Sequence, residues 1–208
     1  MTYTLLETIQ RIVRQELGQV RTAEIGTVSD QHAHTGASDT DNYACTVELR
    51  NSGLVLKRVP VATPQIGAVA IPAVGDLVLV QFVNGDINSP IITGRLYSDA
   101  MRPPVNDDGK SVLHLPADAA DSDAVHVEVQ SGSQRQIELR LGSTLKIDLK
   151  DDDPVIAIDV DSGKAKVTIG RDGAVTIESQ GDVAIKGNQI NVEAQGTLTL
   201  KGATVNIN

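Results

Sequence analysis

The chain has 208 residues, of which 18 are basic and 27 acidic, so its formal net charge is −9. This length permits one large domain or two small ones, and the 40% apolar content predicts a folded chain. No apolar run reaches the about 18–20 residues that a membrane span needs. The acidic charge and the shortage of aromatic rings disfavour nucleic-acid binding. The single Cys45 excludes an internal disulfide framework and a cysteine-based zinc cluster.

The aromatic residues are few and unevenly placed. The chain has one Phe, three Tyr and no Trp, and none of them follows Tyr97. Aromatic side chains usually supply much of the buried area in a core. The second half must therefore bury Val, Ile and Leu, or share a core with other chains.

The first residues predict one short amphipathic helix over residues 4–17. Its apolar stripe has helical spacing and consists of Leu5, Leu6, Ile9, Ile12, Val13 and Leu17. Thr4 and Glu7 suit a capping box, and Gly18 suits the helix end. Packing on its own domain and docking to a neighbouring subunit both remain open for this helix. The stretch lacks the order of a signal peptide, which predicts synthesis in the cytoplasm without one.

Short β-patterns follow the helix. Apolar or alternating runs occur at residues 24–28, 43–49, 54–61, 77–83 and 91–97, with turn residues between them. Five short strands over this length predict a small Greek-key barrel of the OB type. Residues 29–42 are polar and predict an exposed loop, and the stretch around Pro103-Pro104 predicts a linker.

The second half contains a short repeat. Pairs of apolar residues that bracket one other residue recur every seven or eight positions over much of this half, with glycines between them. Each unit reads as a very short strand and a tight corner, which cannot bury a core alone. The pattern favours an intertwined three-chain β-prism in which every backbone group pairs with a neighbouring chain. Its predicted trimer core contains Val167, Ile169, Val175, Ile177, Val183, Ile185, Ile190 and Val192. A stack of hairpins in a monomeric sandwich is the alternative.

The predicted fold class is therefore all-β with a short N-terminal helix, an OB-fold barrel and an intertwined trimeric β-helix or β-prism. The predicted divisions are the helix at 1–18, the OB domain at 19–98, a linker at 99–111 and the needle at 112–208.

Nine residues of the first half carry a resemblance to a known family. They are Pro72, Gly75, Asp76, Phe82, Gly85, Asp86, Pro90, Gly94 and Tyr97. Their order resembles the OB domain of contractile-injection spike proteins: baseplate protein V of contractile-tailed phages, the VgrG protein of type VI secretion and the spikes of extracellular injection systems. The residue types predict tight turns at Gly75-Asp76 and Gly85-Asp86. Strand starts are expected at Pro72 and Pro90, and barrel packing for Phe82 and Tyr97.

The resemblance implies a homotrimeric, non-enzymatic spike in a phage virion, a tailocin, an extracellular injection particle or a secretion system. Its partners would be the baseplate hub, the tail tube and, transiently, the target membrane. Leu5, Ile9 and Ile12 are the expected hub or tube contacts. The sequence has no lysozyme-like insertion and no His after His126, so the resemblance implies a blunt needle capped by a PAAR-repeat tip protein. The expected tip-docking residues are Leu198, Leu200, Thr204, Val205, Asn206, Ile207 and Asn208.

Candidate chemical sites are weak. His32 and His34 have the one metal-like spacing, but two imidazoles in a polar loop rarely suffice to hold a metal. Three copies of Asp151-Asp152-Asp153 would gather nine carboxylates at one level, where a structural cation could bind. No nucleophile triad or phosphate-binding loop is legible, and no catalytic residue or cofactor is expected.

Two other functions are consistent with parts of the pattern. A β-helix hydrolase or lyase acting on polysaccharide would need clustered carboxylates and aromatic sugar platforms, and the second half has no aromatic residue. An OB-fold nucleic-acid-binding protein would need basic residues and rings on one barrel face, which are missing.

Overall fold

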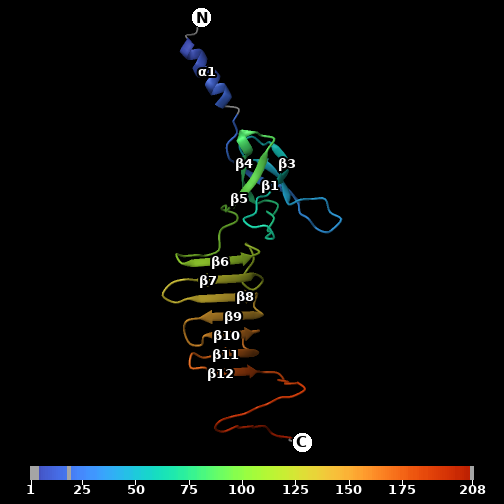
Figure 1. The fold of residues 1–208 in the computed structure, drawn as a ribbon, viewed down its shortest axis with the longest axis vertical. Coiled ribbons are helices and arrows are strands. Elements are labelled where there is room, and N and C mark those ends of the chain that lie inside the picture. Colours follow the sequence, from blue (N-terminus) through green and yellow to red (C-terminus); the bar gives the residue numbers. More distant parts are fainter. Residues whose placement is uncertain (1–4, 18–19, 207–208) are drawn as a thin grey trace. The chain divides into compact units, whose positions relative to one another are not determined.

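The structure is a computed structural model that describes residues 5–17 and 20–206. The chain divides into two compact units, Met1–Pro103 and Pro104–Asn208. The prediction of a mostly β chain with one N-terminal helix and antiparallel sheets is confirmed (Figure 1). The predicted cap at Thr4 and the predicted helix end at Gly18 lie outside the described residues.

The helix α1 spans Leu5–Leu17. Leu5, Ile9 and Ile12 lie on one side of it, as the sequence spacing requires, and their side chains are exposed. An amphipathic helix with an uncovered apolar side has the character of a docking element.

The first unit contains a five-stranded antiparallel sheet. Its strands are β1 (Glu24–His32), β2 (Ala44–Leu49), β3 (Val55–Pro60), β4 (Leu77–Phe82) and β5 (Pro90–Leu96), in the order β3-β2-β1-β4-β5. A parallel bridge between Val61 and Ile92 joins the two edges, so the sheet closes into a barrel. Closure in this order is the arrangement of an OB fold and leaves few unpaired strand edges.

The barrel core is aliphatic with one aromatic ring. Its buried members are Val28, Cys45, Val47, Leu49, Val59, Val78, Val80, Phe82 and Ile92. They come from all five strands through the alternation of inward and outward side chains. One closely packed core thus holds the barrel together within a single chain.

The first strand is longer than the sequence predicts. Residues 29–32, expected in a loop, continue β1 and pair with β2 after a register shift between Val28 and Asp30. The shift is a β-bulge, which lets a strand continue with polar residues outside the core alternation. Pro72 also differs, because it lies in the segment before β4 and does not begin a strand, whereas Pro90 begins β5.

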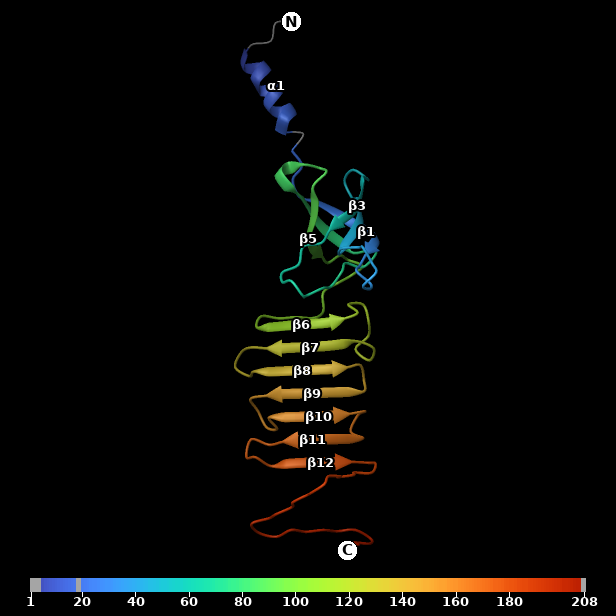
Figure 2. The same cartoon turned by 45° about the vertical axis from the view of Figure 1, so that its right-hand side comes forward.

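The second unit is a single seven-stranded antiparallel meander (Figures 1 and 2). Its strands are β6 (Lys110–Leu115), β7 (Val125–Gln130), β8 (Gln136–Leu141), β9 (Leu145–Lys150), β10 (Ile156–Val160), β11 (Ala165–Ile169) and β12 (Val175–Ser179). Consecutive strands pair with each other, so this ladder forms within one chain. The expectation that these strands pair with neighbouring chains is therefore wrong for residues 110–179.

Glycines and short polar residues shape the hairpin turns of the meander. Gly142, Gly163 and Gly173 have φ of +54°, +92° and +86°, and they follow β8, β10 and β11. A β-carbon on Gly142 would lie 2.3 Å from the carbonyl oxygen of Ser122. Positive φ reverses the chain within a few residues, which gives rungs of nearly equal length.

The strand pattern ends after β12. Residues 180–206 form no strand, although the apolar pairs Val183/Ile185 and Ile190/Val192 continue the repeat there. Both figures show this segment as an extended trace. Strands were expected at these pairs, and a single chain does not form them because it offers no neighbour to complete the ladder.

Candidate functional site

The seven-stranded sheet has two chemically different faces. Alternate residues of each strand lie on one face, and the register aligns them in three rows across the sheet. The central row is Leu113, Val127, Leu139, Ile147, Ile158, Val167 and Ile177; the second is Leu115, Val125, Leu141, Leu145, Val160, Ala165 and Ser179; the third is Ser111, Val129, Ile137, Leu149, Ile156, Ile169 and Val175. Only the two serines in these rows are polar. We call this surface the apolar face.

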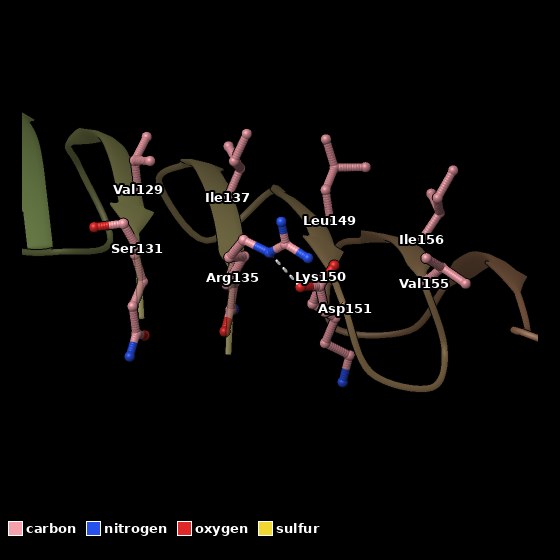
Figure 3. Close-up of a pocket in the computed structure, with 11 residues that line it drawn as sticks. Val129, Ser131, Arg135, Ile137, Leu149, Lys150, Asp151, Val155 and Ile156 are labelled. Atoms are coloured by element: carbon pink, nitrogen blue, oxygen red, sulfur yellow. Dashed lines mark hydrogen bonds and ion pairs between the residues drawn. The ribbon is translucent and has the colours of Figure 1, made fainter. Parts of the chain in front are cut away.

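The apolar face is uncovered within one chain. Leu113 is 51% exposed and Ile177 66% exposed, and other side chains of the face are about half-exposed. Figure 3 shows Val129, Ile137 and Leu149 pointing to the same side of the sheet, next to a shallow hollow. A continuous apolar surface over seven strands is typical of an interface.

The burial energy available on this face is substantial. Nine of its large apolar side chains are exposed: Leu113, Leu115, Val125, Val129, Ile137, Leu141, Leu149, Val175 and Ile177. Covering the exposed half of each contributes about 1 kcal/mol, so the sum is of order 10 kcal/mol per copy. Three copies would gain about three times this sum, whereas their two association steps cost roughly 4–15 kcal/mol each, so the face can support a stable assembly.

The opposite face carries a network of charges over β6–β9. The Glu138 carboxylate lies 2.8 Å from Arg140 Nε and 2.9 Å from Lys146 Nζ, and Lys146 also lies 3.1 Å from Asp148. The hydrogen bond to Glu138 raises the pKa of Lys146 above its ordinary value. Such partly exposed pairs stabilise little individually. Their main effect is on register, because a slip by one residue would place these charges on the apolar face.

A histidine pair on the charged face was missed by sequence reasoning. His114 and His126 are cross-strand partners, and their Nδ1 atoms lie 3.2 Å apart. His114 Nε2 lies 2.9 Å from the carbonyl oxygen of Ala119, so it donates there, and His114 Nδ1 accepts from His126. His126 is only 8% exposed, and its Nε2 has no hydrogen-bond partner among the residues that the structure describes. The hydrogen bond between the two histidines connects β6 to β7. A correct prediction of the pairing register of these two strands would have placed the histidines side by side.

The acidic corner after β9 is occupied by internal partners. Arg135 Nε lies 2.6 Å from Asp151, as Figure 3 shows, and the backbone N–H of Arg171 donates to Asp153 at 2.9 Å. Arg171 also donates from its side chain to the carbonyl oxygen of Asp151. These bonds therefore hold neighbouring turns of the sheet together. The binding of a structural cation at this corner stays a prediction.

The structure does not bring His32 and His34 to a common point. His32 Nε2 lies 2.9 Å from the Thr46 hydroxyl, and His34 Nδ1 lies 3.2 Å from the Asp41 carbonyl oxygen. Among residues 5–17 and 20–206, no three His, Cys, Asp or Glu side chains are grouped so that they could hold a metal ion.

The loop around His34 is organised by Asp39. Its carboxylate accepts hydrogen bonds from the backbone N–H groups of Thr35 and Asp41, at 2.8 and 2.7 Å. These bonds to the charged form lower the pKa of Asp39 to about 2.

The family-motif residues build turns of the barrel. Gly75 and Gly85 have φ of +96° and +77°, which favours glycine. Asp76 accepts the backbone N–H of Ala73 at 2.9 Å, and Asp86 accepts that of Asn88 at the same distance. Each motif Gly-Asp pair thus closes its own turn, and the aspartates have a structural role.

The remaining motif residues divide into buried and exposed ones. Pro72 and Phe82 are buried, and the Pro72 carbonyl oxygen accepts a hydrogen bond from Gln31 Nε2. Gly94 lies in β5, one residue past a register shift, with open space where a β-carbon would be. Tyr97 is 59% exposed, so the expectation that it packs in the barrel is wrong. It follows the last residue of β5 and therefore lies beyond the core alternation.

The expected contacts at the other sites are accessible. Leu198, Leu200 and Val205 are exposed, while Ile207 and Asn208 lie outside the described residues. The predicted core positions Val167, Ile169, Val175 and Ile177 lie on the apolar face, whereas Val183, Ile185, Ile190 and Val192 lie in the strandless segment and are exposed. In the part of the chain that is described, no helix is long and apolar enough to cross a membrane.

Comparisons with known proteins find a similarity over part of the barrel. Residues 48–97 match the family model described as the type VI secretion system/phage-baseplate injector OB domain. A stretch of 43 residues, 21% of this chain, is 51% identical to the actin cross-linking toxin VgrG1 of Vibrio cholerae serotype O1. The stretch corresponds to only 4% of that protein's length. The predicted resemblance is thereby confirmed over residues 48–97, which are similar to the OB domain of type VI secretion system and phage-baseplate injectors.

Proposed function

We propose that this chain is the central spike of a contractile injection apparatus and that it works as a homotrimer. The apolar face is the observation that carries the proposal, because a sheet with one continuous apolar face must be covered by something. Three copies that turn this face inward form a closed prism whose charged faces meet water. The number three comes from the resemblance of the barrel to spike proteins.

The composition of the sheet supports a narrow interior. The three rows contain only aliphatic residues and two serines, and no aromatic residue follows Tyr97. A prism axis lined by three copies has room for stacked Val, Ile and Leu but little room for rings.

The mechanism is mechanical and needs no catalytic residue. Sheath contraction drives the assembly forward, and the closed prism transmits the force to the envelope of the target cell. Stiffness follows from the backbone ladder of β6–β12 and from a shared core that cannot slide without exposing apolar area.

The ends of the chain supply the partner contacts in this proposal. The apolar side of α1, with Leu5, Ile9 and Ile12, docks to the hub or tube. Residues 198–208 dock a PAAR-repeat tip protein. The particle is a phage tail, a tailocin, an extracellular injection system or a secretion system.

Two deletions in the full particle test these assignments. Removing residues 1–18 should abolish hub binding and leave the truncated chain trimeric, as measured by pull-down and light scattering. Removing residues 198–208 should abolish co-purification with the tip protein. If both truncated chains still assemble into complete particles, the partner assignments are wrong.

A further inference from the structure

The histidine pair of the charged face lies beside the connection between β6 and β7, at the start of the second unit. Residues 116–124 form this connection, and Ala119 within it accepts the hydrogen bond from His114 Nε2 at 2.9 Å. The backbone N–H of Gly142 donates to the carbonyl oxygen of Ala124, so the same connection is also bound to the turn after β8. The pair therefore lies where three neighbouring strands are joined.

Hydrogen bonding determines where the protons of the neutral pair lie. His114 Nε2 donates to the carbonyl oxygen of Ala119, so His114 Nδ1 has a lone pair and accepts from His126 Nδ1 at 3.2 Å. His126 Nε2 then has a lone pair as well. This atom is buried and has no hydrogen-bond partner in the part of the chain that the structure describes. His126 Nε2 can therefore take a further proton without the loss of any existing hydrogen bond.

A carboxylate lies next to this nitrogen. Glu128 follows His126 by two residues in β7, and its Oε2 lies 3.9 Å from His126 Nε2. The other carboxylate oxygen, Oε1, lies 3.0 Å from Lys110 Nζ of β6. A proton on His126 Nε2 would point to Oε2 and leave the contact with Lys110 in place. The protonated ring would thus be buried with a partner of opposite charge, whereas the neutral ring has an unpaired buried nitrogen.

The charges around His126 favour one more cation. Arg140 of β8 is its cross-strand partner, and Arg140 lies 3.0 Å from Asp121 of the connection and 2.8 Å from Glu138. Asp118 and Asp123 of the connection are exposed to water. The ion pairs of this face over β6–β9 contain the cations Lys110, Arg140 and Lys146 and the carboxylates Asp121, Glu128, Glu138 and Asp148. Carboxylates exceed cations by one in this network, and a protonated His126 balances it.

We propose that His126 Nε2 is a proton-binding site and that its protonation forms an ion pair with Glu128 that strengthens the β6–β7 hairpin. The unfolded chain lacks this ion pair, so the added stability is present in mild acid and is lost as the pH rises. Histidine suits the role because its charge changes between about pH 5 and 8. The contacts lie within one chain, so the inference does not rest on the proposed function.

The histidine pair accommodates one proton and not two. A second proton would go to His114 Nδ1, which would then lose the lone pair that accepts from His126. Two cationic rings would also lie side by side. Stronger acid should therefore break the hydrogen bond that mild acid leaves intact.

NMR of the full chain with ¹⁵N-labelled histidine tests the site of protonation. When the pH falls from about 8 to about 5.5, the proton should appear on His126 Nε2, while His114 Nδ1 stays an acceptor. Glu128→Gln should weaken proton binding at His126 about tenfold, because it removes the nearby negative charge. Glu178→Gln makes the same change on the same face in β12 and should have no effect. A first proton on His114, or equal binding in the two variants, overturns the inference.

Hydrogen exchange on the full chain tests the effect on the hairpin. The amides of β10 and β11 in the same sample correct for the direct effect of pH on exchange. Relative to them, the amides of β6 and β7 should be roughly five- to tenfold better protected at about pH 5.5 than at about pH 8. His126→Asn cannot take the proton and should lose this gain, as should Glu128→Gln, which keeps both imidazole rings if the first variant does not fold. No gain in the unaltered chain, or a gain that persists in Glu128→Gln, contradicts the inference.

Discussion

A charge placed on the apolar face should prevent assembly, and Val167 of β11 is the most informative position. It lies in the central row between Ile158 and Ile177, so each copy would direct the new Asp carboxylate into the shared interior. A buried, unpaired carboxylate costs several kcal/mol after relaxation. Three of them in one layer cost of order 10 kcal/mol per trimer, in addition to the lost packing of Val.

The neighbouring residue provides a matched control. Thr168 lies on the same strand and on the opposite face, so Thr168→Asp adds the same charge toward water. Because each 1.4 kcal/mol changes an equilibrium constant tenfold, Val167→Asp should weaken association by many orders of magnitude and Thr168→Asp very little. Light scattering at micromolar concentration measures both masses. Equal masses for the two variants, at three times the chain mass, would refute the reasoning.

Three further changes test the barrel and its loop. Gly26→Ala would place a β-carbon 2.2 Å from Val47 Cγ1 in the closed barrel, so it should lower the free energy of unfolding by about 2 kcal/mol. Gly94→Ala has open space around the new β-carbon and should not lower it. Thermal unfolding of the two variants measures the difference. Because the pKa of Asp39 is lowered to about 2, its hydrogen bonds stabilise the loop above about pH 4, and this stabilisation is lost as pH falls toward 2. The NMR shifts of the two amides that donate to Asp39 should titrate near pH 2. A midpoint near pH 4 would contradict this prediction. Burial raises the pKa of the Cys45 thiol, so thiol reagents should modify it only after unfolding, and rapid modification of the folded chain would disagree with its buried position.

The sequence was a good guide where local chemistry decides structure. Positive-φ glycines and short aspartate turns define the barrel, and apolar pairs such as Leu145/Ile147 and Ile156/Ile158 define the rungs of the sheet. These features depend on residues close together in the chain, so their spacing predicts them. The longer β1 was not predicted because a bulge after Val28 changes the alternation on which strand assignment depends.

The candidate site was predicted only in part, for a physical reason. The apolar pairs indicated a shared core, but the strand pairing that aligns them is set by hairpin turns at positions such as Gly142 and Gly163. Spacing alone could not tell a ladder within one chain from a ladder between chains. The hydrogen bond between His114 and His126 likewise depends on register across two strands, which no local pattern encodes.

The account depends most on the claim that copies of this chain cover the apolar face. Native mass spectrometry of the full chain tests it directly. We expect one dominant species at three times the chain mass of 22.0 kDa. A stable single-chain species at micromolar concentration, with the apolar face still in water, would contradict the account.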